Sequence, residues 1–197
     1  MKRILCLLLF SLSLSAQSTP SLRALTEKVY ITAAGCNNAT ASTSLDLPTA
    51  NAPTPICIGT TTTSGLLGFA DAATQVATIH YRLSSDWTAT GGVDLDLIHT
   101  GDTSSVNNIR WQVSTACVAD TEDLIAPAYN AASASNNAGP TTAGQRRTVT
   151  FTGVAVTNCA ASETLYIKLE RVGADAGDTY AGVARLHSTV LTLRRVQ

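Results

Sequence analysis

Two aspartates, Asp175 and Asp178, stand in the short turn GADAGDT between two strand-like segments. Carboxylate oxygens in a loop are typical ligands of Ca²⁺, which takes about six to eight oxygen ligands. The EF-hand spacing is absent, however, and Asp and Gly are also the ordinary residues of tight turns. We therefore expect a plain hairpin turn here, and a calcium site at Asp175 and Asp178 is the alternative.

The patterns of nucleophilic and zinc-dependent hydrolases are missing from the chain. There is no G-x-S-x-G motif, in which a serine sits on a strained turn beside an oxyanion hole. The three histidines, His80, His99 and His187, lie on separate segments without an H-x-H or H-E-x-x-H pattern. A metal cluster would require these segments to converge in space, and the sequence gives no sign of it.

Glycosidic cleavage needs a pair of carboxyl groups, and four acids are available for it. Two of them alternate with apolar residues in VDLDLIH, which explains them as solvent-facing residues of a half-buried strand. We expect no catalytic residue, and a secreted hydrolase is the least favoured hypothesis. The four acids are Asp94, Asp96, Glu163 and Glu170.

Four cysteines follow the N-terminal segment: Cys36, Cys57, Cys117 and Cys159. An even number in an exported chain indicates two disulfides, and three connectivities are open. We favour Cys36–Cys57, which closes a local loop, and Cys117–Cys159, which joins the end of one strand to the start of another. A zinc site would need short paired spacings such as C-x-x-C, and none occurs.

The N-terminus has the order of a secretory signal peptide. Lys2 and Arg3 precede the apolar run ILCLLLF, and small and polar residues follow it. The run is far shorter than the roughly 20 apolar residues of a membrane-spanning helix. We expect residues 1–16, with Cys6, to be removed, and the protein to be secreted or extracytoplasmic, in a periplasm or at a cell surface.

Composition excludes further classes of protein. Charged residues make up 14% of the chain and the formal net charge is −1, so there is no basic excess for nucleic acid. No second apolar stretch is long enough to span a membrane.

Aromatic residues make up only 5%, and Trp111, between Ile109 and Val113, is expected in the core. Tyr129, inside a long polar segment, is the candidate ligand-binding residue.

Apolar and polar residues alternate with a period of two along the chain, and a sustained helical period is absent. Clusters of Gly, Asn, Asp, Pro and Ser separate these stretches, as turns separate strands. We therefore expect about seven or eight strands. The clearest are 27–33, 75–83, 93–99, 109–113, 147–156, 165–172 and 183–193.

These strands predict an all-β protein, a two-sheet antiparallel β-sandwich with two long loops, at 33–74 and 119–145. A jelly roll fits the mixture of short hairpins and long connections. An immunoglobulin-like sandwich is second, because its Cys…Trp…Cys order is absent. Residues 17–197 are expected to form a single domain, of which 75–195 is the best-patterned part.

Several stretches of the second half carry a resemblance. They are LSSDW, VDLDLIH, NNIRWQV, TVTFTGVAVTNCAASETLYIKLERV and DTYAGVARLHSTVLTLRR. Residues 75–195 thereby resemble jelly-roll structural proteins of phage virions. The resemblance implies a module that assembles or displays, often as a trimer, and it supplies no catalytic residues. The signal peptide and the N-terminal cysteine pair depart from that pattern.

The function expected from the sequence is therefore non-enzymatic: an exported β-sandwich that acts in assembly or surface display. Its partner is then another copy of the chain, as in a trimer, or a surface partner. The alternative is a carbohydrate- or ligand-binding module that uses the 119–145 segment around Tyr129. We expect no cofactor apart from the calcium alternative.

Overall fold

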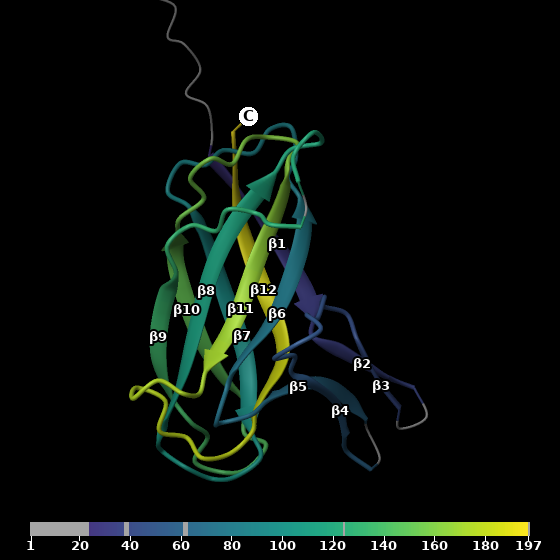
Figure 1. The fold of residues 1–197 in the computed structure, drawn as a ribbon, viewed down its shortest axis with the longest axis vertical. Helices are drawn as coiled ribbons and strands as arrows, with labels where there is room; N and C mark the ends of the chain where they lie inside the picture. Colours follow the sequence, from purple (N-terminus) through teal and green to yellow (C-terminus); the bar gives the residue numbers. More distant parts are fainter. Residues whose placement is uncertain (1–23, 38–39, 61–62, 124, 197) are drawn as a thin grey trace, which may run out of the picture.

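The computed structural model describes residues 24–37, 40–60, 63–123 and 125–196, so the predicted signal peptide, 1–16, lies outside the described residues. All the regular structure within these ranges is β-strand (Figure 1). The strands are β1 Ala24–Thr32, β2 Ala34–Asn37, β3 Thr40–Thr43, β4 Thr54–Ile58, β5 Ser64–Phe69, β6 Thr74–Arg82, β7 Val93–Gly101, β8 Asn108–Val118, β9 Ser133–Ala138, β10 Arg147–Val154, β11 Thr164–Val172 and β12 Ala184–Val196.

Two antiparallel sheets form the sandwich. One has the order β10-β7-β12-β5-β4, with β1 also paired to β12, and the other has the order β6-β11-β8-β9. Four antiparallel pairs are enclosed one within another in sequence, as in a single long hairpin folded over two sheets: β5·β12, β6·β11, β7·β10 and β8·β9. This nesting of eight strands over two sheets is the jelly-roll arrangement. The predicted fold class is confirmed.

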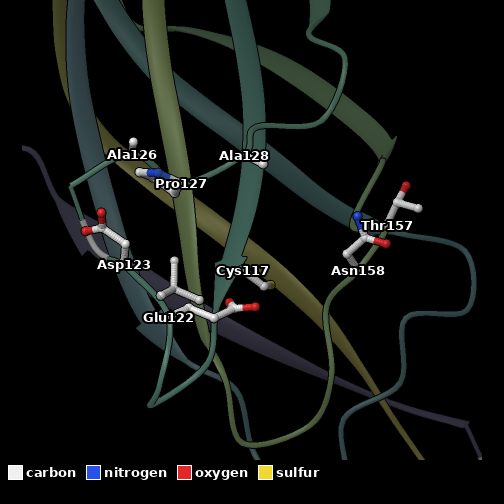
Figure 2. A pocket seen from close by; sticks show the side chains of 9 residues that line it. Cys117, Glu122, Asp123, Ala126, Pro127, Ala128, Thr157 and Asn158 are labelled. Atoms are coloured by element: carbon white, nitrogen blue, oxygen red, sulfur yellow. The ribbon is translucent and has the colours of Figure 1, made fainter.

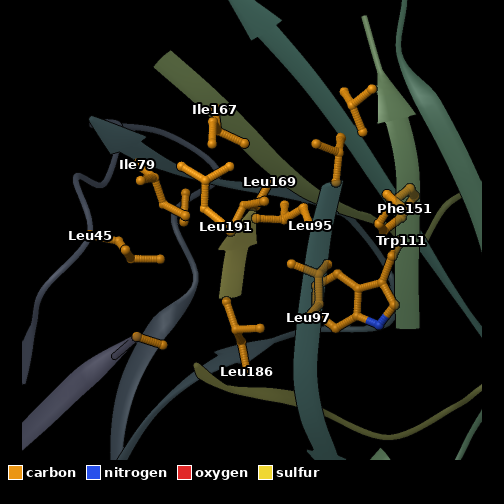
Figure 3. Packing of buried hydrophobic residues seen from close by; sticks show 14 of the residues in the cluster. Leu45, Ile79, Leu95, Leu97, Trp111, Phe151, Ile167, Leu169, Leu186 and Leu191 are labelled. Carbon is orange, nitrogen blue, oxygen red and sulfur yellow. The ribbon is translucent and has the colours of Figure 1, made fainter. Parts of the chain in front are cut away.

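Alternation along the strands places the core between the sheets. In β8, Ile109, Trp111 and Val113 are fully buried, whereas the intervening Arg110 and Gln112 are only half-buried. Figure 3 shows the Trp111 indole packed among leucine, isoleucine and phenylalanine side chains from both sheets. Burying each large apolar side chain stabilises the fold by about 1.5–3 kcal/mol.

Strand β12 is long enough to pair with two partners along the same edge. Its first residues, Ala184–Leu186, pair with β5, and its second half, Ser188–Val196, pairs with β1. The small sheet β2-β3 and strand β4 project from the body beside β5 (Figure 1).

Both expected disulfides are confirmed, Cys36–Cys57 and Cys117–Cys159. The first joins β2 to β4 in the projecting part, and the second joins the end of β8 to the connection before β11. Such bonds are typical of proteins outside the cytoplasm. In the part of the chain that the structure describes, no helix is long and apolar enough to cross a lipid bilayer.

The two segments expected to be long loops need correction. The 33–74 segment contains β2, β3, β4 and β5, and the 119–145 segment contains β9. Strand β9 reads SASNNA and has no large apolar residue, so no alternation marks it. Strand β5 reads SGLLGF and is buried at four consecutive positions, which also removes the period of two.

Candidate functional site

The acidic turn is organised around a buried arginine. Arg171, on β11, is fully buried, and its Nε and Nη2 donate to the two carboxylate oxygens of Asp178 at 2.9 and 2.8 Å. Its remaining N–H groups donate to backbone carbonyls of Phe69, Gly182 and Tyr180. All five donors of the guanidinium group are therefore used.

The second aspartate serves the turn itself. One carboxylate oxygen of Asp175 accepts a hydrogen bond from the backbone N–H of Gly177 at 2.7 Å and lies 3.3 Å from Nε of Arg110. Asp178 also accepts from the backbone N–H of Arg110. Calcium at this turn would have to compete with two guanidinium groups. Among the described residues there is no group of three or more His, Cys, Asp or Glu that could hold a metal ion.

Of the four acids considered for glycosidic cleavage, two lie on the same face of one strand and the other two lie on other elements. Asp94 and Asp96 are on β7 and pair with Arg194 and the Thr150 hydroxyl, at 3.2 and 2.7 Å. Glu170, on β11 in the other sheet, lies 3.3 Å from Nζ of Lys168. Glu163 accepts from the backbone N–H of Ala160 in a turn. Asp94 and Asp96 are the two neighbours among them, and each already has a partner in the sheet; neither lines one of the three recesses described below.

Tyr129 lines a groove of about 450 Å³, here called the outer-face groove because its floor is on the solvent side of the four-stranded sheet. Tyr129 and the floor residue Tyr166 belong to a small apolar cluster that is separate from the main core. The nine lining residues are Asp46, Leu47, Pro48, Thr78, His80, Ile125, Pro127, Tyr129 and Tyr166.

The floor of the groove is aromatic. His80 on β6 and Tyr166 on β11 are register partners, and their ring centroids lie 4.2 Å apart with planes 55° from parallel. Nδ1 of His80 lies 2.9 Å from a carboxylate oxygen of Asp46. The pKa of the Tyr129 phenol is raised, because the effect of burial exceeds the opposite effect of a hydrogen bond with Thr78. The Tyr129 hydroxyl thus stays protonated at neutral pH and available for hydrogen bonding.

Two smaller hollows adjoin the groove. One, of about 270 Å³, lies beside Cys117, with Glu122 and Asp123 on one side and Thr157 and Asn158 on the other (Figure 2). The other, of about 290 Å³, shares Tyr166 with the groove. All three border the 118–129 segment, so this segment shapes the whole recessed surface.

Sequence reasoning found Tyr129 but missed the residues around it. His80 and Tyr166 occupy outward positions of alternating strands, and an aromatic residue at an outward position was the available signal. Asp46 had no such signal, because two strands, β4 and β5, separate it from β6 in the sequence. The other two histidines lie elsewhere: His99 is buried in β7, and His187 lies on β12.

Comparison with known proteins does not assign the chain to a family. No protein-family model and no curated protein matches the chain. Dimeric latent PorU from Porphyromonas gingivalis matches at a TM-score of 0.43 and 10% identity, over 91% of this chain and 14% of that one. A CBM4 structure matches at a TM-score of 0.35 and 14% identity, over 75% of this chain and 81% of that one. The chain thus spans a small part of PorU, and likenesses this distant carry no functional argument.

Proposed function

We propose that this chain is a non-enzymatic extracytoplasmic module that binds a ligand in the outer-face groove. The observation that carries the proposal is the aromatic lining: the exposed His80, the half-buried Tyr129 and the largely buried Tyr166 meet in an open, largely apolar recess outside the core. Aromatic side chains supply large contact areas at low cost in conformational entropy, and they are enriched at binding surfaces. Export rests on the N-terminal segment and is supported by the two disulfides.

The charges around the groove favour an uncharged ligand. Asp46 faces His80, and Lys168, whose Nζ lies 5.2 Å from the Tyr129 ring centroid, is paired with Glu170. The one lysine near the Tyr129 ring is thus already paired, and Asp46 places a carboxylate in the lining. A phosphorylated or acidic ligand would have to break the Lys168–Glu170 pair to gain a cation. A neutral carbohydrate or an uncharged peptide would not.

The composition of the lining supports binding without catalysis. Asp46 and His80 resemble two members of a hydrolytic triad, but the residues described as lining the groove include no serine or cysteine beside them. The hydroxyl groups present are those of Thr78 and the two tyrosines. Acid–base cleavage of a glycan would need a second carboxyl group across the bond, and Asp46 is the groove's one acid in the described lining.

Substitution of the groove tyrosines tests the proposal. Panels of neutral oligosaccharides and of short uncharged peptides would be screened against the disulfide-bonded protein, and hits titrated by calorimetry. We expect Tyr129→Ala and Tyr166→Ala each to weaken binding at least about tenfold, since each removes a ring contact. Tyr30→Ala, on β1 away from the groove, is the matched control. Equal affinity of all three variants would contradict the site.

Self-assembly is a second candidate function, favoured by β1. This strand pairs with β12 on one side, and no described strand pairs with its other side. Tyr30, on β1, is 75% exposed. Unprotected edge strands pair readily with other chains, and the resemblance of 75–195 in sequence to phage virion proteins supports the same role.

Light scattering of the wild type and of Tyr30→Arg tests self-assembly: we expect a wild-type oligomer, such as a trimer, that the substitution disrupts. A monomeric wild type would end this candidate.

A further inference from the structure

Strand β6 is the edge of the four-stranded sheet next to the groove, and the backbone of residues 46–51 already covers part of that edge. The backbone N–H of Thr78 donates to the Asp46 carbonyl at 2.9 Å, and the Asp46 N–H donates to the Thr78 carbonyl at 3.0 Å. The Val76 N–H donates to the carbonyl of Asn51 at 2.9 Å. The molecule thus already pairs one backbone position of this edge in the antiparallel sense, with Asp46 opposite Thr78.

The covering stops at Asp46. The residue two positions earlier, Ser44, turns its N–H to the carbonyl of Ala33 at 3.1 Å, so it does not continue along β6. In an antiparallel pair the backbone N–H and C=O groups of every second residue point toward the partner strand. After Thr78, the next residue of β6 whose backbone groups point to the open edge is therefore His80. Within the described ranges, the His80 N–H has no backbone partner. The edge therefore continues past Asp46 with its hydrogen-bonding groups available.

The outer-face groove borders this open position, because the His80 side chain is part of its lining. The lining includes four aliphatic residues from two separate segments of the chain: Leu47 and Pro48, and Ile125 and Pro127. Ile125 is 92% exposed, the highest exposure among the large apolar residues described. A fully exposed isoleucine at a binding recess matches an apolar partner surface, whereas it offers no hydrogen bond to the hydroxyl groups of a sugar.

We propose that the occupant of the groove is an extended, uncharged polypeptide segment that pairs antiparallel with β6 at His80–Arg82 and lays apolar side chains between Ile125 and Leu47. This inference rests on the proposed binding function and specifies its partner. Addition of a strand to an open sheet edge combines main-chain hydrogen bonds with pockets for alternate side chains. The edge at His80 and the groove beside it supply these two components.

Panning a phage-displayed library of short linear peptides on the immobilised, disulfide-bonded protein would supply the probe. Enriched peptides would be synthesised with capped ends and titrated by fluorescence anisotropy. We expect uncharged sequences with apolar side chains at alternate positions. Ile125→Asp should weaken their binding at least about tenfold, whereas Val106→Asp, a matched change at a residue that is 72% exposed and outside the groove, should not.

Backbone N-methylation separates strand pairing from side-chain contact alone. Methylating the alternate amides that face β6 should weaken binding at least about tenfold, and methylating the intervening amides should have little effect. Peptides that tolerate methylation at every position, or that bind Ile125→Asp like wild type, would overturn the inference.

The same screen distinguishes this inference from the function on which it rests. If neutral oligosaccharides bind and Tyr129→Ala abolishes their binding, while no peptide does so, the groove binds a ligand but the polypeptide class is wrong. If no peptide or oligosaccharide binds in a manner that depends on Tyr129, both the inference and the proposed function fail.

Discussion

The acidic turn and the outer-face groove differ in how their polar groups are used. At the turn, the Arg171 guanidinium and the Asp178 carboxylate are almost completely buried, and every donor of Arg171 has an acceptor. At the groove, Asp46 and His80 are paired but remain substantially exposed, and the aromatic rings beside them face an open recess.

This difference separates a structural site from a candidate binding site. A buried charge whose partners are all internal has no capacity left for a ligand, and its removal exposes the cost of burying the remaining charge. An exposed pair adds little to stability, commonly less than about 1 kcal/mol, because water and salt screen it. The sequence predicted a plain turn with calcium as the alternative, and the contacts of Asp178 and Arg171 likewise favour the groove over the turn as the place for a ligand.

The largest effect that we expect follows from breaking the buried pair. Asp178→Ala would leave the Arg171 guanidinium buried without its counter-charge and lower the free energy of unfolding by about 3–5 kcal/mol. Asp175→Ala, at the half-buried carboxylate of the same turn, should cost about 1 kcal/mol or less. Urea titration measures both values. Similar losses for the two variants would show that pairing with Arg171 is not what stabilises the turn.

His99 tests a buried polar group that is only partly satisfied. It is fully buried, its Nε2 lies 3.0 Å from the Asn137 Oδ1, and its Nδ1 has no partner among the described residues. Burial, helped by the nearby charge of Arg147 and opposed by the hydrogen bond with Asn137, lowers the pKa of His99 from 6.5 to about 4. The unfolded chain therefore binds a proton at His99 more readily than the folded protein does. The contribution of the neutral, buried His99 to stability is complete above about pH 6.5 and is lost as the pH falls toward 4.

We expect a loss on the order of 3 kcal/mol between these two pH values from this histidine. Urea titrations across the interval would measure it. His99→Gln should flatten that part of the pH dependence, whereas His187→Asn, on β12, should leave it as in the wild type. An unchanged slope in His99→Gln would assign the acid sensitivity to other groups.

A smaller effect on stability is expected at the groove. Tyr129→Ala removes a half-buried ring from the small outer cluster, so the free energy of unfolding should fall by about 1 kcal/mol or less while ligand binding is lost. Thermal unfolding and calorimetric titration of one preparation would give both quantities. A loss of several kcal/mol would indicate that Tyr129 belongs to the structural part of the molecule.

Calcium should have the smallest effect. Both carboxylate oxygens of Asp178 accept hydrogen bonds from Arg171, so the turn offers a cation few remaining lone pairs. We expect the same unfolding temperature with calcium and with EDTA. A calcium-dependent rise that Asp175→Ala or Asp178→Asn abolishes would restore the metal site at this turn.

The sequence was sufficient to predict the sandwich because period-two alternation reports directly which residues face the core. It was sufficient for the disulfides because four cysteines allow few pairings. Odd positions of β11, including Leu165, Ile167 and Leu169, are buried as that pattern requires. Arg171 follows them at the next inward position, so its burial was implied, but its partner across the turn was not. Alternation also carries no information on polar or uniformly buried strands such as β9 and β5.

The groove was less predictable because it combines segments that are distant in sequence. Asp46, His80, Ile125 and Tyr166 come from four different parts of the chain. Only the register of β6 against β11 places His80 beside Tyr166, and a register is a tertiary property. Tyr129 was identifiable because an aromatic residue in a polar segment has few structural reasons to be there.

The position of β12 has a consequence for how the chain reaches its native state. This strand lies between β7 on one side and β1 and β5 on the other, yet it is the last strand in sequence. The six-stranded sheet therefore cannot close until the whole preceding chain has been synthesised, and its pairings span most of the polypeptide. Such non-local pairing makes folding slow. Until β12 is available, the edges of β1, β5 and β7 that it covers stay unpaired, so this one strand completes the sandwich.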